Sequence, residues 1–364
     1  MKKIIFFHLL NDYSGSPKVL SQVIDCVYSA GGEVELFLGG DASEGFLSSV
    51  PAKTHRYFYK RFHNKYLTLL SYSYSQLVLF LKLLKYKNES SVFYVNTLLP
   101  FGAALAGKLI GVKVVYHIHE TSIRPKSLKL FLRGVVAICS SRNIFVSEFL
   151  AKAEPFPRIV SNVVYNSTSE CFELAAKKHV YHPFRAAKFC VMMACSLKGY
   201  KGVYEFVEIA RCLSVEEVFT FKLILSASKS EVELFFNGID LPDNITIILS
   251  VNDMKPYYAD ASILLSLSKT EEWVETFGLT ILEGLSFGLP CIVPPLGGPV
   301  ELVTDNVEGY LIRSNDIQCI VEKLVSLKND PLTCYRLSEA AKKKSLMFSC
   351  NSFKCNLLGV LDVI

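Results

Sequence analysis

SKTEEWVETFGLTILEGLSFGLPCIVPPLGGPVELVTDNVEG, residues 268–309, is the stretch that decides the fold. It follows a short apolar run at Ser262–Leu267 and contains a helical pattern at Phe277–Phe287 and a second apolar run at Cys291–Val293. A buried strand, a helix and another buried strand in this order are typical of a parallel βαβ unit. We therefore predict α/β architecture for this part of the chain.

The same alternation runs through the rest of the 364 residues. We predict further strands at Lys3–Leu10, Glu33–Leu38, Val92–Asn96, Lys113–Ile118, Asn143–Val146, Ile159–Tyr165, Lys188–Ala194, Thr220–Ser226 and Ile245–Leu249. Further helices are predicted at Pro17–Ala30, Tyr66–Tyr86, Phe101–Ile110, Lys126–Ala137, Glu148–Ala153, Val203–Cys212, Ser230–Asn237, Ile317–Leu327 and Pro331–Leu346. Strands that alternate with helices predict doubly wound parallel sheets.

The length predicts two domains. We expect one Rossmann-like domain over residues 1–165, a linker without clear periodicity over 166–187 and a second Rossmann-like domain over 188–346. Residues 347–364 are expected to form a helix that can return to the first domain. Two such sheets in tandem place the carboxyl ends of their strands around one central cleft, where these folds bind ligands.

The cysteines and the apolar runs indicate the compartment. Eleven cysteines are scattered without a CxxC pair, which is typical of free thiols in a reducing cytoplasm. The run Ile4–Leu10 resembles a signal peptide, but His8 interrupts it and no small-residue cleavage site follows. The longest apolar run near Leu77–Leu84 is interrupted by Lys82, so we expect no membrane-spanning helix. The prediction is a cytoplasmic protein, attached at most to the inner face of a membrane.

The charge is distributed unevenly. Residues 1–165 contain 20 basic and 10 acidic residues, whereas residues 166–364 contain 19 and 24. Residues 45–88 contain eight basic residues and no acid, interleaved with aromatic residues. Such a mixture suits an anionic lipid surface. Nucleic acid is the competing partner, which we do not expect here, and a solvated basic face with aromatic residues in the core remains an alternative.

The start of the helix after Ser262–Leu267 predicts an anion site. Phe277, Gly278 and Leu279 would present backbone N–H groups, and the positive end of the helix dipole favours a phosphate. Glu275 and Glu283 are eight residues apart, which predicts a separation of about 12 Å along the helix axis. That distance is too large for a pair of carboxylates at one glycosidic bond, so each would contact a different part of an extended ligand. As an alternative, Glu275 caps the helix and Glu283 faces solvent.

These motifs resemble those of the retaining GT-B glycosyltransferases of the family 4 type, also described as glycosyl transferases group 1. The stretch Glu275–Glu283, followed by Gly288–Pro290 and Gly297–Glu301, resembles the E-x7-E signature of the family. Further similarities lie at Val146–Ser147, Val163–Asn166, Tyr257–Asp260 and Lys201–Val203, and at His119, which resembles the cleft histidine of the family. Their order and spacing over residues 1–348 are specific.

The resemblance implies a hexosyltransferase that moves a sugar from a nucleotide diphosphate sugar to a saccharide or lipid-linked saccharide. It implies that Lys201 binds the diphosphate, Glu283 the ribose and Glu275 the donor sugar, while His119 orients that sugar. Together with the basic first half, it implies an enzyme of surface polysaccharide biosynthesis, such as O-antigen, capsule or lipopolysaccharide, with the acceptor bound by residues 1–165.

Two positions depart from the family pattern. The family usually has an arginine five residues before the diphosphate lysine, where this chain has Ser196; Lys198 is the candidate substitute. The first loop has one glycine, Gly15, where many relatives have two. Ser16 can cap the following helix, so this loop either presents N–H groups to the donor or simply begins a helix.

The sequence contains no Asp-x-Asp pair and no His/Cys cluster, so we expect no metal and no cofactor besides the nucleotide sugar. Three alternatives share the fold: a nucleotide-sugar epimerase, a phosphorylase, and a noncatalytic membrane-bound subunit that binds nucleotide sugar. A dinucleotide-dependent dehydrogenase is disfavoured because no GxGxxG follows the first strand.

Overall fold

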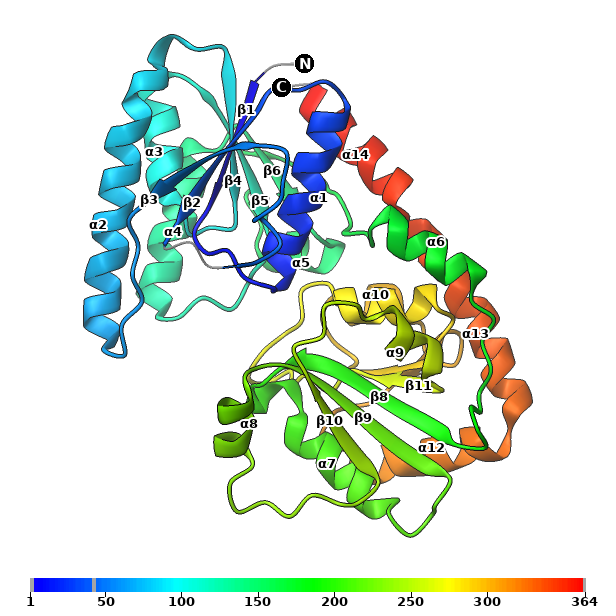
Figure 1. Ribbon diagram of the computed structural model, residues 1–364. Coiled ribbons are helices and arrows are strands. Elements are labelled where there is room, and N and C mark those ends of the chain that lie inside the picture. Colours follow the sequence, from blue (N-terminus) through cyan, green and yellow to red (C-terminus); the bar gives the residue numbers. More distant parts are fainter. Residues whose placement is uncertain (1–2, 41–43, 363–364) are drawn as a thin grey trace. The chain divides into compact units, whose positions relative to one another are not determined.

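The computed structural model describes residues 3–40 and 44–362, which form two α/β units (Figure 1). Unit 1 combines residues 1–166 with residues 351–364, and unit 2 comprises Ser167–Cys350. The segment 166–187, predicted as a linker without periodicity, contains helix α6 (Glu170–Lys178), which lies in unit 2. Ser169 begins this helix because its hydroxyl accepts a hydrogen bond from the N–H of Phe172.

Unit 1 is built on a seven-stranded sheet in the order β3-β2-β1-β4-β5-β6-β7, with every neighbouring pair parallel. Its strands are β1 (Lys3–His8), β2 (Val34–Gly39), β3 (Lys53–Tyr57), β4 (Ser91–Asn96), β5 (Lys113–Ile118), β6 (Arg142–Phe145) and β7 (Val160–Val163). The order reverses between β1 and β4, and ligands bind such sheets at the carboxyl edge of this position.

The helices of unit 1 are α1 (Gly15–Ser29), α2 (Lys65–Leu83), α3 (Phe101–Ile110), α4 (Lys126–Cys139), α5 (Glu148–Ala153) and α14 (Cys350–Asp362), which continues into this unit from Cys350. Helices α2, α3 and α4 pack side by side on one face of the sheet, and α1 covers the other (Figure 1). Right-handed crossovers require this arrangement, because the chain runs toward one edge of the sheet before β3 and toward the other after it.

Unit 2 has a six-stranded parallel sheet in the order β10-β9-β8-β11-β12-β13. Its strands are β8 (Phe189–Ser196), β9 (Phe219–Ser226), β10 (Ile245–Leu249), β11 (Ile263–Leu265), β12 (Cys291–Val293) and β13 (Gly309–Leu311). Its further helices are α7 (Val203–Cys212), α8 (Lys229–Phe235), α9 (Lys255–Asp260), α10 (Leu279–Ser286), α11 (Pro299–Leu302), α12 (Ile317–Asn329) and α13 (Pro331–Ser345). The order reverses between β8 and β11.

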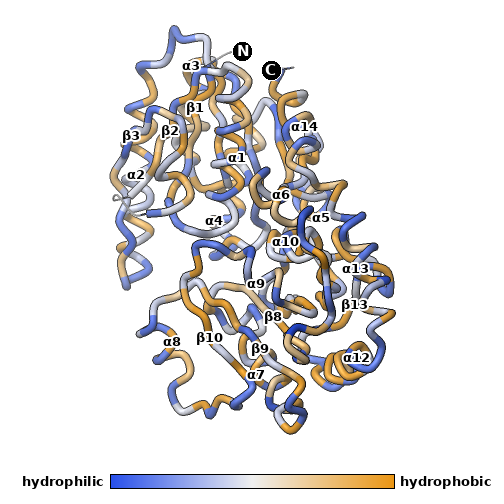
Figure 2. Tube along the Cα trace, turned by 45° about the vertical axis from the view of Figure 1, so that its right-hand side comes forward, coloured by the Kyte–Doolittle hydropathy of each residue, from blue (hydrophilic) through white to orange (hydrophobic). Residues whose placement is uncertain are grey.

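The central strands are buried on both faces, as continuous apolar runs predict. Ile4, Ile5, Phe6 and Phe7 of β1 are each at most 3% exposed, and the apolar runs of both units are orange in Figure 2. Strand β3 was not predicted. Its sequence, KTHRY, has no apolar run, and three of its five residues are exposed at the edge of the sheet. Pairing with β2 therefore makes it a strand.

An ion-pair network joins β1 to β2 at the amino end of the first sheet. Lys3 Nζ lies 2.8 Å from Glu35 Oε1 and 3.0 Å from Glu89 Oε2. Glu35 Oε2 accepts a hydrogen bond from the Tyr86 hydroxyl at 2.7 Å and lies 2.9 Å from His55 Nε2. Burial opposes the ionisation of Glu35, but the hydrogen bonds from Lys3, Tyr86 and His55 outweigh it and lower the pKa of this carboxyl to about 2.

Glu35→Gln should lower the free energy of unfolding by about 2 kcal/mol at pH 7, because it removes one member of a largely buried ion pair. A carboxyl with a lowered pKa stabilises the fold above its unfolded pKa, 4.5, and loses this effect as the pH falls toward 2. Urea denaturation of both proteins should therefore converge in acid. Glu33→Gln is the control, since Glu33 is 70% exposed and 3.6 Å from Lys3; an equal effect of both substitutions would contradict the prediction.

Candidate functional site

A lysine and a glutamate from distant parts of unit 2 meet near the carboxyl edge of its sheet. Lys201 ends the short 3-10 turn η2 (Gly199–Lys201) after β8, and Glu275 lies in the loop between β11 and α10. Lys201 Nζ is 2.5 Å from Glu275 Oε2, and the two side chains are 16% and 26% exposed. Because β8 and β11 are the strands between which the order reverses, the pair lies where sheets of this kind bind ligands.

Gly202 allows Lys201 to approach the end of β11. Its φ is +79°, and a Cβ at this position would lie 2.2 Å from the carbonyl oxygen of Leu267. Any other residue would push η2 away from the sheet. In the pair Lys201-Gly202, the lysine therefore supplies the charge, and the glycine is required by the backbone geometry.

Helix α10 begins at Leu279, so Glu275 lies four residues before the helix and not on it. The predicted separation of about 12 Å along one helix axis is therefore wrong, because it assumed a helical rise between the two glutamates. The capping alternative for Glu275 is also wrong. Gly278, which has no side chain, occupies the N-cap position with φ +105°, and Glu275 lies three residues before it. A side chain here is disfavoured, since its Cβ would lie 2.8 Å from Ile281 Cδ1.

The loop after β12 holds the Glu275 loop in place. The N–H of Gly298 donates to the carbonyl oxygen of Glu275 at 2.8 Å. A Cβ on Gly297 would lie 2.5 Å from that oxygen, and one on Gly298 would lie 2.3 Å from Phe277 Cα. The two glycines therefore let one loop support the other along its backbone, which fixes the direction of the Glu275 side chain.

Glu283 lies deeper in unit 2 and is only 3% exposed. Its Oε2 accepts a hydrogen bond from the Tyr258 hydroxyl at 2.7 Å. Tyr258 is fully buried on α9, and burial raises the pKa of its hydroxyl well above the usual value, so it remains a hydrogen-bond donor. The alternative that Glu283 faces solvent is therefore wrong.

Ser196 and Lys198 line a pocket of about 300 Å³ at the carboxyl ends of β8 and β9. The remaining lining residues are Leu197, Ser226, Ala227, Glu231, Leu234 and Phe235. Ser196 ends β8, and Lys198 is exposed. The charge of Lys198 contributes to a lowered pKa of Glu231, after the hydrogen bonds from Ser228. Lys198 thus faces a pocket whose lining includes neither Lys201 nor Glu275.

Two aromatic residues beside Lys201 were missed as candidates. The rings of Tyr200 and Trp273 stack with their centroids 5.3 Å apart, and Lys201 Nζ lies 5.5 Å from the Trp273 centroid. Trp273 is the single tryptophan of the chain. The sequence signal that could have identified Trp273 as a site residue is its position two residues before Glu275. The stacked rings hold the lysine ammonium close to the glutamate.

In unit 1, His119 belongs to a hydrogen-bonded group at the ends of β1, β4 and β5. His119 Nε2 lies 2.8 Å from Asn96 Oδ1, and Asn96 Nδ2 lies 3.3 Å from the carbonyl oxygen of Ser16 and 3.1 Å from His8 Nδ1. Because Nδ2 donates to Ser16, Oδ1 faces His119 and accepts. His119 therefore carries its proton on Nε2, and Nδ1 is its acceptor atom.

His119 is held neutral. Burial lowers its pKa well below 6.5, and the neighbouring His117 and His8 lower it further. His117 is fully buried and packs against His119, with ring centroids 4.2 Å apart and the ring planes tilted by 48°. The Tyr94 hydroxyl lies 2.8 Å from His117 Nδ1. His117 is therefore a hydrogen-bonded interior residue.

Glu120, next to His119, is a candidate that was given no role from the sequence. Its carboxylate accepts hydrogen bonds from the N–H of Leu98 at 3.1 Å and of His119 at 3.2 Å. Burial raises the pKa of Glu120 to about 7, although these hydrogen bonds oppose the shift. A carboxyl that titrates near neutral pH at the carboxyl edge of a sheet can exchange a proton with a ligand.

Asn96→Asp should raise the pKa of His119, because a carboxylate would replace the neutral amide 2.8 Å from Nε2 and favour the imidazolium. His8 should shift in the same direction. Carbon-detected NMR titration of the imidazole signals measures both values. Asn162→Asp is the control on β7 of the same sheet and should leave His119 unchanged. An unaltered His119 titration in Asn96→Asp would contradict the hydrogen-bond assignment.

The loop between β1 and α1 places the predicted pair Gly15 and Ser16 at the start of α1. The helix begins at Gly15, and its N-cap residue is Ser14, whose side chain does not cap it. Ser16 therefore is not the cap, contrary to prediction. Instead Asp12 Oδ1 accepts from the N–H of Ser14 at 2.9 Å, and the carbonyl oxygen of Ser16 accepts from Asn96. The side-chain amide of Asn96 thus hydrogen-bonds to both Ser16 and His119.

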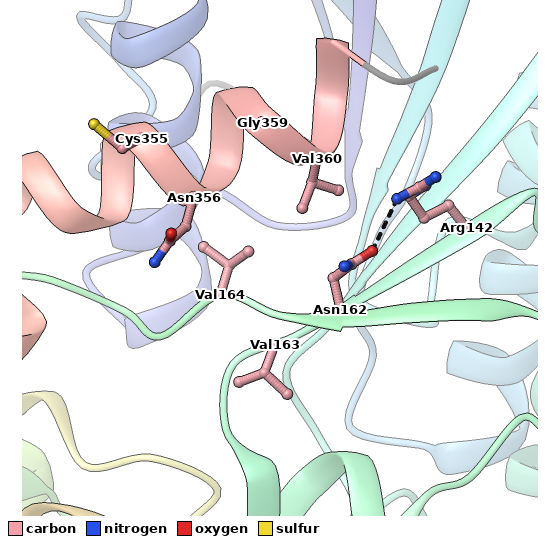
Figure 3. A pocket seen from close by; sticks show the side chains of 8 residues that line it. All are labelled: Arg142, Asn162, Val163, Val164, Cys355, Asn356, Gly359 and Val360. Atoms are coloured by element: carbon pink, nitrogen blue, oxygen red, sulfur yellow. Dashed lines mark hydrogen bonds between the residues drawn. The ribbon is translucent and has the colours of Figure 1, made fainter.

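A second pocket, of about 440 Å³, lies between β7 and α14 in unit 1 (Figure 3). Arg142 and Asn162 point toward one another there, with Arg142 Nη1 3.0 Å from Asn162 Oδ1. The other lining residues are Val163, Val164, Cys355, Asn356, Gly359 and Val360. None of the predicted catalytic or donor-binding residues lines it.

Within residues 3–40 and 44–362, no three His, Cys, Asp or Glu side chains come close enough together to hold a metal ion. The positive groups near Glu275 in unit 2 are the Lys201 ammonium and the amino end of α10. Such groups bind phosphates.

Comparison with known proteins gives a family match in unit 2. Residues 178–344 match the family described as glycosyl transferases group 1. The sulfoquinovosyl transferase SQD2 of Arabidopsis thaliana is 28% identical over 120 residues, which cover 32% of this chain and 22% of that protein. The UDP-Gal:alpha-D-GlcNAc-diphosphoundecaprenol alpha-1,3-galactosyltransferase of Escherichia coli is 26% identical over 247 residues, 62% of this chain and 63% of that protein. The chain matches less than two thirds of the length of either relative.

Among solved structures, Anabaena Alr3699/HepE in complex with UDP and glucose is similar with a TM-score of 0.79 and 19% identity, over 100% of both chains. Sucrose-phosphate synthase of Thermosynechococcus elongatus is similar with a TM-score of 0.77 and 14% identity, over 100% of this chain and 98% of that one. At these identities the likeness concerns the fold. The predicted GT-B class, with two Rossmann-like parallel-sheet domains, is confirmed.

Proposed function

We propose, since residues 178–344 match the group 1 glycosyl transferases, that this protein is a retaining glycosyltransferase of the family 4 type. The observation that carries the proposal is the contact between Lys201 and Glu275 within that matched segment. A cation and a carboxylate 2.5 Å apart can bind adjacent parts of one nucleotide sugar, the diphosphate and the sugar hydroxyls. Anabaena Alr3699/HepE, which has this fold, was solved in complex with UDP and glucose.

In the proposed donor complex, Lys201 leaves Glu275 and binds the diphosphate, which gains further hydrogen bonds from N–H groups of Phe277, Gly278 and Leu279. Glu275 binds a hydroxyl of the transferred sugar, and Glu283 binds the ribose. Ser196 and Lys198 contact the donor from their pocket. For unit 1 we propose the roles that the resemblance implies: Gly15 and Ser16 bind the donor through backbone N–H groups, and His119 hydrogen-bonds to a sugar hydroxyl.

The proposed reaction breaks the bond between the anomeric carbon and the diphosphate oxygen and forms a bond from the same carbon to the acceptor oxygen. The acceptor attacks on the face that the diphosphate leaves, so the anomeric configuration is retained. The acceptor hydroxyl proton ends on the departing phosphate. Lys201 stabilises the negative charge that develops on this leaving group.

We propose a saccharide or lipid-linked saccharide as the acceptor, and surface polysaccharide biosynthesis as the role. The Escherichia coli relative is named for a diphosphoundecaprenol acceptor, a lipid-linked saccharide. The excess of basic over acidic residues in 1–165 suits an acceptor that carries a diphosphate, and it suits peripheral attachment at the inner face of the cytoplasmic membrane.

The proposal includes no metal. Lys201 and the start of α10 supply the positive charge that a divalent cation would otherwise bring. Activity should therefore persist in a chelator. Turnover that stops in the chelator and returns with Mg²⁺ or Mn²⁺ would overturn this part of the proposal.

A panel of nucleotide sugars, screened for thermal stabilisation of the full chain, identifies the donor. NMR of the product formed with that donor and a lipid-linked saccharide then reports the anomeric configuration. Retention supports the proposal, and inversion overturns the mechanism. Epimerisation without acceptor or phosphorolysis would support the corresponding alternative enzyme, and binding without turnover of any acceptor would support a noncatalytic subunit.

A further inference from the structure

Helix α2 has large apolar side chains on its outward face and buries polar ones. Its face toward the unit is mixed: Ser71, Ser75 and Gln76 are 8%, 0% and 1% exposed and lie there beside buried Tyr72, Leu79 and Leu83. Its outward face carries Tyr66, Leu70, Tyr74, Leu77 and Leu81, which are 67%, 66%, 57%, 54% and 56% exposed. Spacings of four, four, three and four residues place these five on one stripe. A surface helix normally has a polar outward face.

The inward contacts hold α2 in this orientation. Gln76 Oε1 accepts from the N–H of Gly102 on α3 at 3.1 Å, and the Tyr72 hydroxyl donates to the carbonyl oxygen of Leu99 at 2.6 Å. A Cβ on Gly102 would lie 2.2 Å from the carbonyl oxygen of Gln76, so the two helices approach closely. Rotation of α2 to bury its apolar stripe would break these hydrogen bonds.

Helices α3 and α4 extend the apolar surface. Leu109 of α3 is 66% exposed, and Leu130, Phe131 and Ile138 of α4 are 71%, 49% and 67% exposed. Because α2 packs on α3 and α3 on α4, the three helices that carry these side chains form one layer of unit 1 (Figure 1). We name it the α2–α4 face. Monomeric proteins rarely leave so many large apolar side chains together in water.

The α2–α4 face is positively charged as well as apolar. The three helices contain no Asp or Glu, and their cationic residues are Lys65, Lys82, Lys108, Lys126, Lys129 and Arg133. Two of these, Lys129 and Arg133, pair with Glu154. Exposed Lys60, Arg61, Lys85 and Lys87 flank α2. Apolar side chains edged by cations are complementary to the surface of an anionic bilayer.

The structure divides the aromatic residues of the basic segment 45–88. Tyr57, Tyr59, Tyr72 and Tyr86 are at most 8% exposed and belong to the core, as the solvated-face alternative expects. Phe58, Phe62, Tyr66 and Tyr74 are 38% to 67% exposed. Only the second group can contact a partner. The exposed leucines of α2, Leu70, Leu77 and Leu81, which were not predicted to take part, can do so as well.

Lys65–Asn88 is the stretch among the described residues that is long and apolar enough to cross a membrane by length and composition, and 33% of its 18-residue apolar window is buried. Yet α2 connects β3 to β4 of one parallel sheet and packs along that sheet's helical layer. A helix bound in this way can lie on a bilayer but not cross it.

We propose that the α2–α4 face docks flat on an anionic lipid bilayer, with the outward stripe of α2 in the interface. A second copy of the chain is a poorer partner, since it would bring lysines against lysines. The proposal deepens the membrane attachment included in the proposed function. Because its test measures binding without turnover, its failure would leave the proposed glycosyl transfer untouched.

The test is flotation of the full chain with vesicles of phosphatidylcholine and phosphatidylglycerol. The triple variant Leu70→Gln, Leu77→Gln, Leu81→Gln should bind at least about tenfold more weakly, because three partly inserted apolar side chains are lost. Val215→Gln, Leu234→Gln, Leu332→Gln is the matched control; these residues in unit 2 are 88%, 78% and 80% exposed. Lys60→Glu, Arg61→Glu, Lys65→Glu should also release the protein, and high salt should weaken wild-type binding.

Tryptophan fluorescence of the variant Leu77→Trp gives an independent measurement of lipid contact. Brominated lipids should quench this tryptophan but not one introduced by Val215→Trp, after subtraction of the signal of Trp273. Loss of flotation in the α2 variant alone, together with quenching at Leu77, supports the proposal. Absence of wild-type flotation, or equal flotation of the apolar variant and its control, would overturn it. A wild-type dimer that the α2 substitutions dissociate, without vesicle binding, would assign the face to a second copy.

Discussion

Lys201→Ala is expected to weaken the binding of a nucleoside diphosphate by about 2 to 4 kcal/mol, because the diphosphate loses its charged partner in a partly buried site. The Lys201 side chain is 16% exposed, so solvent screens the contact only partly. Titration calorimetry with the nucleoside diphosphate identified by the donor screen measures this loss directly. Lys201→Arg should retain part of the affinity, since the charge remains while its geometry changes.

Lys269→Ala is the matched control for this prediction. Lys269 is also a partly buried lysine of unit 2, 26% exposed, and its Nζ lies 2.7 Å from Glu205 Oε1. Its loss removes an equal charge from unit 2 without touching the Lys201–Glu275 pair. If both alanine variants lost the same affinity, the effect would come from net charge, and Lys201 would not be the diphosphate ligand.

Glu275→Gln should lower kcat on the order of 100-fold while the free nucleoside diphosphate binds at least as tightly as in the wild type. The carboxylate belongs to the proposed sugar contact, which matters most in the transition state. Its removal also frees Lys201, which it holds at 2.5 Å, and takes a negative charge away from the diphosphate. Steady-state kinetics and calorimetry on one preparation separate these effects.

Glu283→Gln should do the reverse: raise the donor KM and weaken nucleoside diphosphate binding, with a smaller effect on kcat. The amide oxygen introduced by this substitution would still accept the hydrogen bond from Tyr258, so the fold should persist. Glu272→Gln, an exposed position in the Glu275 loop, is the control and should change neither quantity. If Glu275→Gln abolished nucleoside diphosphate binding and Glu283→Gln spared it, the two assignments would be reversed.

Local patterns were sufficient for the architecture. Apolar runs such as Ile4–Phe7 are strands because a strand buried on both faces must be apolar throughout. The start of α10 could be located only approximately. The sequence shows Glu275 and Glu283 eight residues apart, but the positive φ of Gly278 delays the helix until Leu279 and leaves Glu275 in a loop.

What the sequence alone determined is thus the α/β class, the chemical types of the candidate residues and the basic, aromatic character of residues 45–88, since each depends on neighbours within a few turns of the chain. The tertiary structure decided the rest. It formed β3 from a polar edge segment, brought Lys201 to Glu275 and Asn96 to His119, buried Glu283 against Tyr258, and turned the apolar side of α2 outward. These outcomes depend on strand pairing and helix packing between residues far apart in the chain, and periodicity shows that a helix has two faces without showing which one the sheet will cover.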